Sequence, residues 1–366
     1  MQAGSAAREG ILRAVPDADV VVRPLADGGE GTVDALIEGL GGEKIHTTVT
    51  GPLGERVECS YGILPDRGLA IMEMASCCGL PLVPRDRLDP RFTTTYGLGE
   101  LIHHAMDRGC REFLIGIGGS ATNDAGIGML TALGFGFYKK DGECAGINGS
   151  ALGQTHRIDT SGADPRLKEC RFRIACDVTN PLYGEHGAAY VYAPQKGATP
   201  EIVVELDDGL QHFAAVCSNF FPSGFHTLPG AGAAGGLGFA FAAFLSAELT
   251  PGVALVLDAI HLHEEVQDAD YVITGEGRMD FQTAMGKAPI GAAKLAKQYG
   301  AYTLAFAGAT TDDAREVNNH GVDAYFAIPQ APLTLREAME TDRAYKNLAS
   351  RAEQVFRVIA LQKPFQ

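Results

Sequence analysis

Short apolar runs alternate with amphipathic helical stretches along most of the chain. In the last third, residues 271–274, 301–307 and 324–328 are rich in apolar, β-branched or aromatic side chains, which predicts buried strands. Helical stretches lie between and after them, the last at 335–359. This β-α-β-α-β-α order is typical of a parallel, doubly wound sheet.

The start of the chain follows the same design, whereas the middle does not. A strand at 19–24 leads through a glycine turn into a helix that ends at Leu40. From Lys44 to Met74 short alternating strands are joined by tight turns, which predicts an antiparallel meander. Further strands are predicted at 112–117, 135–138, 171–176 and 188–192, and helices at 93–106, 200–219, 239–249 and 258–266.

We therefore expect an α/β fold with two α/β domains. Residues 1–43 and 252–366 would form one doubly wound, parallel, Rossmann-like domain from both ends of the chain. Residues 44–251 would form an inserted mixed α/β domain, with the active site in the cleft between the two. The length of 366 residues also favours two domains over one.

The composition of the chain limits which kinds of binding partner and which cellular compartment we expect. The net charge of −15 argues against nucleic acid or an anionic membrane surface, although not against a small anionic substrate. The eight cysteines form no CxxC pair and mostly lie in apolar runs, so we expect reduced thiols and a cytoplasmic protein. The N-terminus lacks the apolar segment of a signal peptide. Acidic α/β enzymes of this size are often homodimers.

Five stretches combine glycine with acidic or other polar side chains, namely 27–32, 118–126, 177–180, 230–235 and 275–280. Open α/β sheets bind ligands where their strands end, and glycine lets a phosphate approach the main chain. Gly275, Glu276 and Gly277 are expected to form a sharp turn after a strand. Each stretch alone is equally consistent with a structural glycine turn, but five in one chain favour a shared site.

A nucleotide-dependent oxidoreductase is an alternative, because Gly230, Gly232 and Gly235 form a G-x-G-x-x-G pattern. The pattern is weak evidence here. Residues 225–228 hardly resemble a strand, and no acidic residue ends a second strand about 20 residues later. P-loop, protein-kinase, GxSxG and HExxH motifs are absent, and the histidines are scattered.

Several of these stretches resemble the signature segments of the bacterial glycerate kinases of the glyoxylate and glucarate pathways, the type I family. The matching segments are 27–32, 118–126, 177–183, 195–197, 232–238 and 274–287. The resemblance runs in order over nearly the whole chain. It implies ATP-dependent phosphorylation of D-glycerate with Mg²⁺, with 2-phosphoglycerate as the product, and two α/β domains with the site between them.

The candidate site residues fall into three groups. The catalytic candidates are Asp27, Asp124, Arg278 and Lys287. The candidates for binding ATP and its phosphates are Gly28, Gly29, Gly118, Gly119, Ser120, Lys196, Gly275 and Gly277. The Mg²⁺ candidates are Asp177, Asn180, Glu276 and Asp280, since Mg²⁺ prefers oxygen ligands, and the cationic side chains would neutralise phosphoryl charge. A solvated loop lysine is an equally good interpretation of Lys196.

One departure from the family concerns the start of the chain. Family members usually open with a β-strand and a Pro-Asp-Ser-Phe-Lys turn, whereas Met1 already lies in the first predicted helix. Losing an interior strand would leave a gap and unpaired backbone groups. We therefore expect roughly fifteen more residues in the native protein, enough for one strand and one turn. If the short start is genuine, a non-catalytic sugar-acid sensor is a further alternative.

Overall fold

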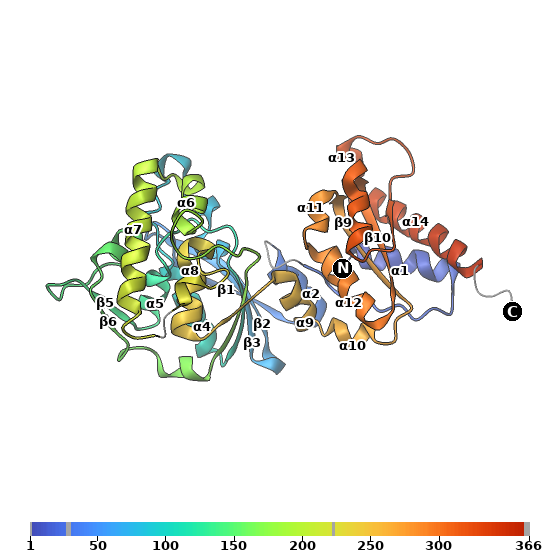
Figure 1. Cartoon of the computed structure of the whole chain (residues 1–366). Coiled ribbons are helices and arrows are strands. Elements are labelled where there is room, and N and C mark those ends of the chain that lie inside the picture. The colour runs from blue at the N-terminus through green and yellow to red at the C-terminus, as the bar shows by residue number, and fades with distance from the viewer. Residues whose placement is uncertain (1, 27–30, 222–223, 362–366) are drawn as a thin grey trace. The chain divides into compact units, whose positions relative to one another are not determined.

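The computed structural model describes residues 2–26, 31–221 and 224–361 (Figure 1). Contacts divide the chain into two compact units. Unit 1 comprises Met1–Asp27 and Val256–Gln366, and unit 2 comprises Gly28–Leu255. No described helix is both long and apolar enough to cross a bilayer.

Unit 2 is built on a six-stranded mixed sheet. Its order is β1-β2-β3-β4-β7-β8, with β1 at Glu43–Thr50, β2 at Arg56–Leu64, β3 at Leu69–Glu73, β4 at Glu112–Gly116, β7 at Arg171–Ala175 and β8 at Glu248–Thr250. The first three strands pair antiparallel, which confirms the predicted meander. The strands from β3 to β8 pair parallel, so the carboxyl ends of four strands share one edge.

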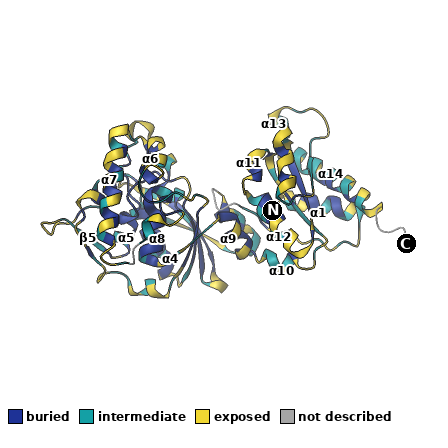
Figure 2. Cartoon of the chain, in the orientation of Figure 1, coloured by how far each residue is buried: buried dark blue, intermediate teal, exposed yellow. Residues whose placement is uncertain are grey.

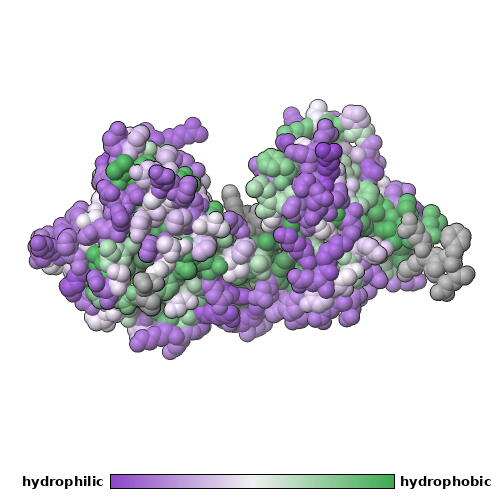
Figure 3. Space-filling model, viewed as in Figure 1, coloured by the Kyte–Doolittle hydropathy of each residue, from purple (hydrophilic) through white to green (hydrophobic). Residues whose placement is uncertain are grey.

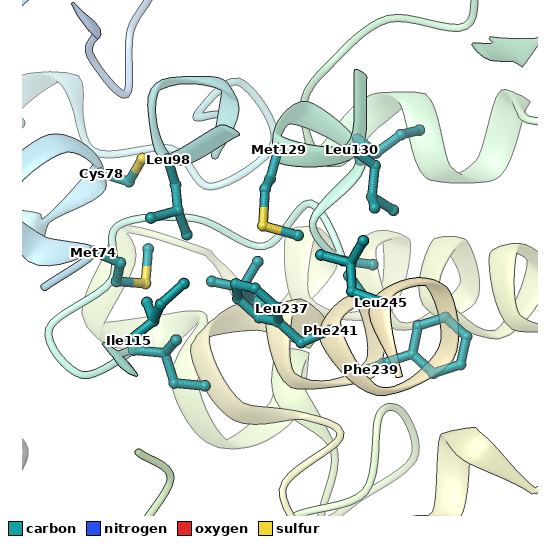
Figure 4. Packing of buried hydrophobic residues seen from close by; sticks show 14 of the residues in the cluster. Met74, Cys78, Leu98, Ile115, Met129, Leu130, Leu237, Phe239, Phe241 and Leu245 are labelled. Atoms are coloured by element: carbon teal, nitrogen blue, oxygen red, sulfur yellow. The ribbon is translucent and has the colours of Figure 1, made fainter. Parts of the chain in front are cut away.

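Helices of unit 2 bury the sheet and one another. The longer ones are α2 (Thr32–Leu40), α4 (Tyr96–Asp107), α7 (Pro200–Cys217) and α8 (Ala233–Leu245), with short α3 (Ala75–Cys78), α5 (Ile127–Ala132) and α6 (Ala188–Tyr192) and a hairpin of β5 (Gly136–Tyr138) and β6 (Arg157–Asp159). Figure 2 shows buried and exposed residues on the same helices, as amphipathic segments require. The side chains of Leu98, Ile115, Met129 and Phe241 pack in one core (Figure 4).

Unit 1 holds a parallel three-stranded sheet, β11-β10-β9, with β9 at Tyr271–Met279, β10 at Tyr302–Thr310 and β11 at Ala324–Ala327. Leu304 and Phe306 of β10 pack with Ile11 of α1 (Gln2–Ala14) and Phe356 of α14 (Thr341–Leu361). The intervening Ala305 and Ala307 join a different cluster, which includes Ile290 of α12 (Ala288–Tyr299). Helices thus cover both faces of the sheet, as in a doubly wound arrangement.

Helix α2 marks the main difference between these units and the predicted domains. The sequence pattern predicts that residues 1–43 belong to the parallel domain. In the structure Ile37 of α2 lies against Gly62 of β2, where there is no side chain, and α2 packs with the six-stranded sheet. The boundaries at residues 27 and 255 therefore differ from the predicted 43 and 252, most at the amino-terminal boundary.

Two predicted strands are wrong. Residues 188–192 form helix α6, since Ala188 and Ala189 are buried while Tyr190 and Val191 are exposed, and the Val191 N–H donates to the Gly187 carbonyl. A short apolar run cannot be assigned to strand or helix by periodicity alone. Residues 19–24 are irregular in the structure. The predicted helix at 258–266 is interrupted, with α9 at Gly252–Ala259 and α10 at Leu262–Val266.

A large cavity lies beside the irregular residues 19–24. Within the described residues β9 pairs only with β10. A cavity of about 2140 Å³ is lined by residues 17–25, by 271–278 of β9, and by parts of α1 and α14. A strand needs a neighbouring backbone to bond with, and the cavity separates residues 19–24 from one. The expectation of an additional strand stays a prediction.

Helices α1 and α14, from opposite ends of the chain, lie side by side in unit 1 (Figure 1). Their approach depends on Gly10, because a Cβ atom there would lie 2.0 Å from the carbonyl oxygen of Ala349. Figure 3 shows hydrophilic residues over much of the visible face of each unit, together with a hydrophobic area where α14 lies. Val358 and Leu361 of α14 are exposed, whereas Phe356 packs with Ile11 of α1.

We predict that Gly10→Val destabilises unit 1 by about 1 to 3 kcal/mol, because the added side chain forces α1 and α14 apart. Gly277→Ala is the matched control, since a Cβ atom there meets nothing within 4 Å. Urea unfolding of both variants measures the effect. Equal midpoints for Gly10→Val and the wild type would contradict this packing.

Candidate active site

The loop that follows β4 lies at the shared carboxyl edge of the parallel strands in unit 2. Residues 118–126 join β4 to α5, and β7 is followed at the same edge by Asp177. The Ala121 N–H donates to the Cys78 carbonyl (2.9 Å), and the Gly119 carbonyl accepts from the Leu80 N–H (2.9 Å). The loop is therefore attached to the segment after β3 as well as to β4.

Asp124 holds the far end of this loop. Its Oδ2 accepts from the Thr95 N–H at 2.8 Å, from the Thr95 hydroxyl at 2.7 Å and from the Gly128 N–H at 3.3 Å, while Oδ1 accepts from the Gly126 N–H at 3.2 Å. The residue is fully buried, and burial raises the pKa of its carboxyl group although these bonds oppose the rise. Both oxygens contact protein, so Asp124 fixes the loop between α4 and α5.

The near end of the loop presents unused donors. Gly118 and Gly119 are exposed, and the N–H groups of Gly118, Gly119 and Ser120 donate to no other residue in the described part of the chain. Gly119 has a left-handed conformation (φ 71°), which glycine adopts without strain. Consecutive free N–H groups in such a bend form a concave site for an anion.

Lys196 lies beneath the same loop. Lys196 ends the short helical turn Pro194–Lys196. The next residue, Gly197, has φ 99°, and a Cβ atom there would lie 2.2 Å from the Leu88 carbonyl oxygen. Lys196 is 1% exposed, and its Nζ donates to the Ser120 hydroxyl and to the Thr122 carbonyl, each at 2.7 Å. Burial lowers the pKa of Lys196 to about 7, and the Asp124 carboxylate partly offsets this effect.

Two neighbouring polar side chains have no partner. The hydroxyl of Thr122 and both amide atoms of Asn123 are buried without a hydrogen bond to any described residue. Such groups normally bond to protein or to ordered water, and leaving one unpaired costs about 1 to 3 kcal/mol. They add polarity to the enclosed side of the 118–126 loop.

The candidate metal ligands of unit 2 are partly engaged. Asp177 is exposed, and its Oδ1 accepts from the Gly252 N–H at 2.9 Å. Asn180 donates to the His186 carbonyl at 2.8 Å, and its Oδ1 accepts from the Tyr192 hydroxyl at 2.6 Å. Asn180 thus ties down the segment between β7 and α6, whereas Asp177 keeps an oxygen for a ligand.

The expected turn in unit 1 is wrong, because β9 continues through Gly275 and Gly277 to Met279. Gly275 pairs with Phe306, and a Cβ atom on Gly275 would lie 2.1 Å from the Phe306 carbonyl oxygen. A Cβ atom on Gly308 would lie 2.6 Å from the Gly277 carbonyl oxygen. These glycines thus permit close approach of β9 and β10 rather than a reversal of the chain.

The remaining candidates of unit 1 gather at the end of β9. Arg278 has a 67% exposed side chain with Nε 3.6 Å from an oxygen of Asp280. Asp280 caps α11 (Phe281–Ala284) by accepting from the Gln282 N–H. Glu276 accepts from the Thr283 hydroxyl. Lys287, at the start of α12, is exposed. Asp27, Gly28 and Gly29 lie outside the described residues.

The G-x-G-x-x-G stretch serves internal packing. Cβ atoms on Gly232 and Gly235 would lie 2.2 and 2.1 Å from the carbonyl oxygens of Pro181 and Thr122. Protein backbone therefore occupies the space that a pyrophosphate would need. A short helical turn at Phe225–Thr227, not a strand, precedes the stretch.

Sequence reasoning missed two residues of the 118–126 site and its surroundings. Thr95 bonds Asp124 and also accepts from the Met129 N–H at 2.9 Å, but a threonine before a helix gives only a capping signal. Glu73, the last residue of β3, accepts from the Val33 N–H at the start of α2 at 2.9 Å. Its place at the carboxyl end of a strand was the available signal.

The structure is thus that of an α/β protein with a glycine loop at a sheet edge whose N–H groups at 118–120 have no described partner. Comparison with known proteins gives its family. The profile of the glycerate kinase family matches residues 1–360. A glycerate kinase of Halalkalibacterium halodurans is 48% identical, covering 95% of this chain and 93% of its own. The glycerate 2-kinase of Escherichia coli K12 is 46% identical, covering 98% and 94%.

A solved structure agrees with these relatives. A candidate glycerate kinase 2 from Salmonella typhimurium LT2 superposes with a TM-score of 0.89 at 43% identity, covering 100% of this chain and 95% of that one. The chain belongs to the glycerate kinase family.

We predict a pH-dependent stability difference between the wild type and Lys196→Met. The folded pKa of about 7 lies below the ordinary lysine value, so folding keeps a penalty for the charged amine at low pH, and the penalty disappears as pH rises. Between pH 7 and pH 9 the free energy of unfolding of the wild type should therefore rise by roughly 2 kcal/mol relative to that of Lys196→Met.

Urea unfolding at several pH values measures this difference. Lys168→Met, at an exposed lysine, is the control and should show little change with pH. A difference between the wild type and Lys196→Met that stays constant from pH 7 to pH 9 would show that Lys196 keeps its ordinary pKa.

Proposed function

We propose that this protein is an ATP-dependent D-glycerate kinase that forms 2-phosphoglycerate. Membership of the glycerate kinase family supports the reaction and implies a nucleotide phosphate donor. The name of the Escherichia coli relative supports the 2-position. The observation that best supports the chemistry is the set of unused N–H groups at Gly118, Gly119 and Ser120, because phosphoryl transfer depends on positioning and charge stabilisation.

In this proposal each part of the 118–126 loop has its own task. Gly118, Gly119 and Ser120 bind an oxyanion of a substrate through hydrogen bonds. Lys196 adds positive charge from below, through its bond to the Ser120 hydroxyl. Asp124, a catalytic candidate from the sequence, instead holds the loop in this proposal, since its hydrogen bonds come from Thr95, Gly126 and Gly128.

Unit 1 is proposed to bind the nucleotide. Ligands of parallel α/β sheets bind outside the carboxyl ends of the strands. The cavity of unit 1 reaches this edge, where Gly275–Arg278 and Gly308–Thr311 line it. Arg278 and Lys287 are exposed cations at or just beyond the end of β9, and they would neutralise charge on the transferred phosphoryl group or the glycerate carboxylate.

The side chains also suit a magnesium ion. Mg²⁺ in kinases uses one or two carboxylates together with phosphate oxygens and water, so a dense carboxylate cluster is unnecessary. Asp177 fits best, since its Oδ2 has no hydrogen-bond partner among the described residues. In unit 2 Asn180 fits less well than Asp177, because Tyr192 already bonds its Oδ1. In unit 1, considered by itself, Asp280 and Glu276 are the candidate oxygen ligands. A bound Mg²⁺ would stabilise phosphate charge.

We predict that Asp27→Asn and Asp280→Asn each lower kcat by 10² to 10³, about 3 to 4 kcal/mol, if Asp27 is the base or a metal ligand and Asp280 a metal ligand. ADP release with D-glycerate and saturating ATP measures turnover, and product analysis identifies the phosphorylated position. Asp66→Asn, in an exposed turn, is the control. Near wild-type turnover in both variants would remove these residues from the site.

A further inference from the structure

Lys196 is unusual because it is enclosed without an acidic partner. Its ammonium can donate three hydrogen bonds, and two acceptors are present, the Ser120 hydroxyl and the Thr122 carbonyl. Neither acceptor is charged. No ion pair involving Lys196 occurs within the described residues. The recorded hydrogen bonds of the Asp124 carboxylate come from Thr95, Gly126 and Gly128.

Few charged groups near Lys196 could compensate a positive charge on its amine. Asp124 is the charged group whose field acts on Lys196. Helix α8 carries no titratable side chain, and the titratable groups of α6 are Tyr190 and Tyr192. The segment that packs on Gly197 carries the exposed Arg85, Asp86 and Arg87. A buried amine in this setting favours its neutral form until a negative charge arrives nearby.

Ser120 connects Lys196 to the exterior. Its side chain accepts from Nζ, and the residue remains 8% exposed beside the unused N–H groups of Gly118 and Gly119. A neutral amine has a lone pair that can accept a hydrogen bond from the Ser120 O–H. A protonated amine has only donors, so the Ser120 oxygen must accept from it and the Ser120 O–H is free to donate outward.

We propose that Lys196 is a positioning residue that takes up one proton when an oxyanion binds over Gly118, Gly119 and Ser120, and thereby turns the Ser120 hydroxyl into a donor to that oxyanion. The proton comes from solvent and adds to the Lys196 lone pair, and no covalent bond to the ligand forms. The proposal rests on the proposed function for the choice of ligand, which is a glycerate carboxylate or a nucleotide phosphate. Both are oxyanions, so either would accept hydrogen bonds from the same N–H and O–H groups.

Titration calorimetry at pH 8.5 in buffers of different ionisation enthalpy tests the coupling. D-glycerate alone, inorganic phosphate alone and ADP with Mg²⁺ are the three probes, so the one that binds this loop is identified. With the folded pKa near 7, Lys196 is mostly neutral at pH 8.5, and we expect uptake of close to one proton for that probe. At pH 5.5 the uptake should fall toward zero.

Three variants separate this role from a structural one. Lys196→Arg, which stays charged, should bind the probe without proton uptake, whereas Lys196→Met should also lack uptake and bind about tenfold more weakly or worse. Lys168→Met should behave as the wild type. Uptake that persists in Lys196→Arg overturns the proposal.

The outcomes for the wild type are also distinct. Binding of every probe without proton uptake overturns the role of Lys196, while glycerate turnover would leave the proposed function intact. Failure of all three probes to bind, together with no ADP release from ATP and glycerate, overturns both.

Discussion

The carboxylate of Asp124 is the constraint on which the unit 2 site depends. Four hydrogen bonds from Thr95, Gly126 and Gly128 hold it between two helices, in full burial. A buried carboxylate is tolerated only when its oxygens are satisfied, so its partners are held in place as firmly as it is. The loop from Gly118 to Gly126 therefore has one end fixed inside the core and the other at the sheet edge.

Because Asp124 fixes one end of the 118–126 loop, the backbone N–H groups at its other end are held in position. Backbone donors lower the energy of an anion most when they need not reorganise on binding. The tethers of Ala121 and Gly119 to the segment after β3 add to the support from Asp124. Lys196 can add a positive charge at the same place. Because Lys196 is buried and its pKa is lowered to about 7, that charge depends on pH and on nearby anions. Arg278 and Lys287 of unit 1 are exposed.

Local pattern in the sequence predicted most strands and the glycine-rich loops, because alternation and β-branched runs report directly on pleated, half-buried backbone. It failed where the deciding partner was distant. Residues 188–192 became a helix through tertiary packing, and Gly275 and Gly277 stayed in a strand because β10 approaches them closely. The signature segments identified Lys196, but its burial beneath Ser120 depends on chain segments 76 residues apart. The shared site of both units stays a prediction.

A crystal structure with bound D-glycerate, ADP and Mg²⁺ would show whether the 118–126 loop binds an oxyanion. We expect an oxyanion oxygen within hydrogen-bond distance of the N–H groups of Gly118, Gly119 or Ser120, with Lys196 still bonded to Ser120. Ligands bound elsewhere, with those three N–H groups contacting only water, would contradict this expectation.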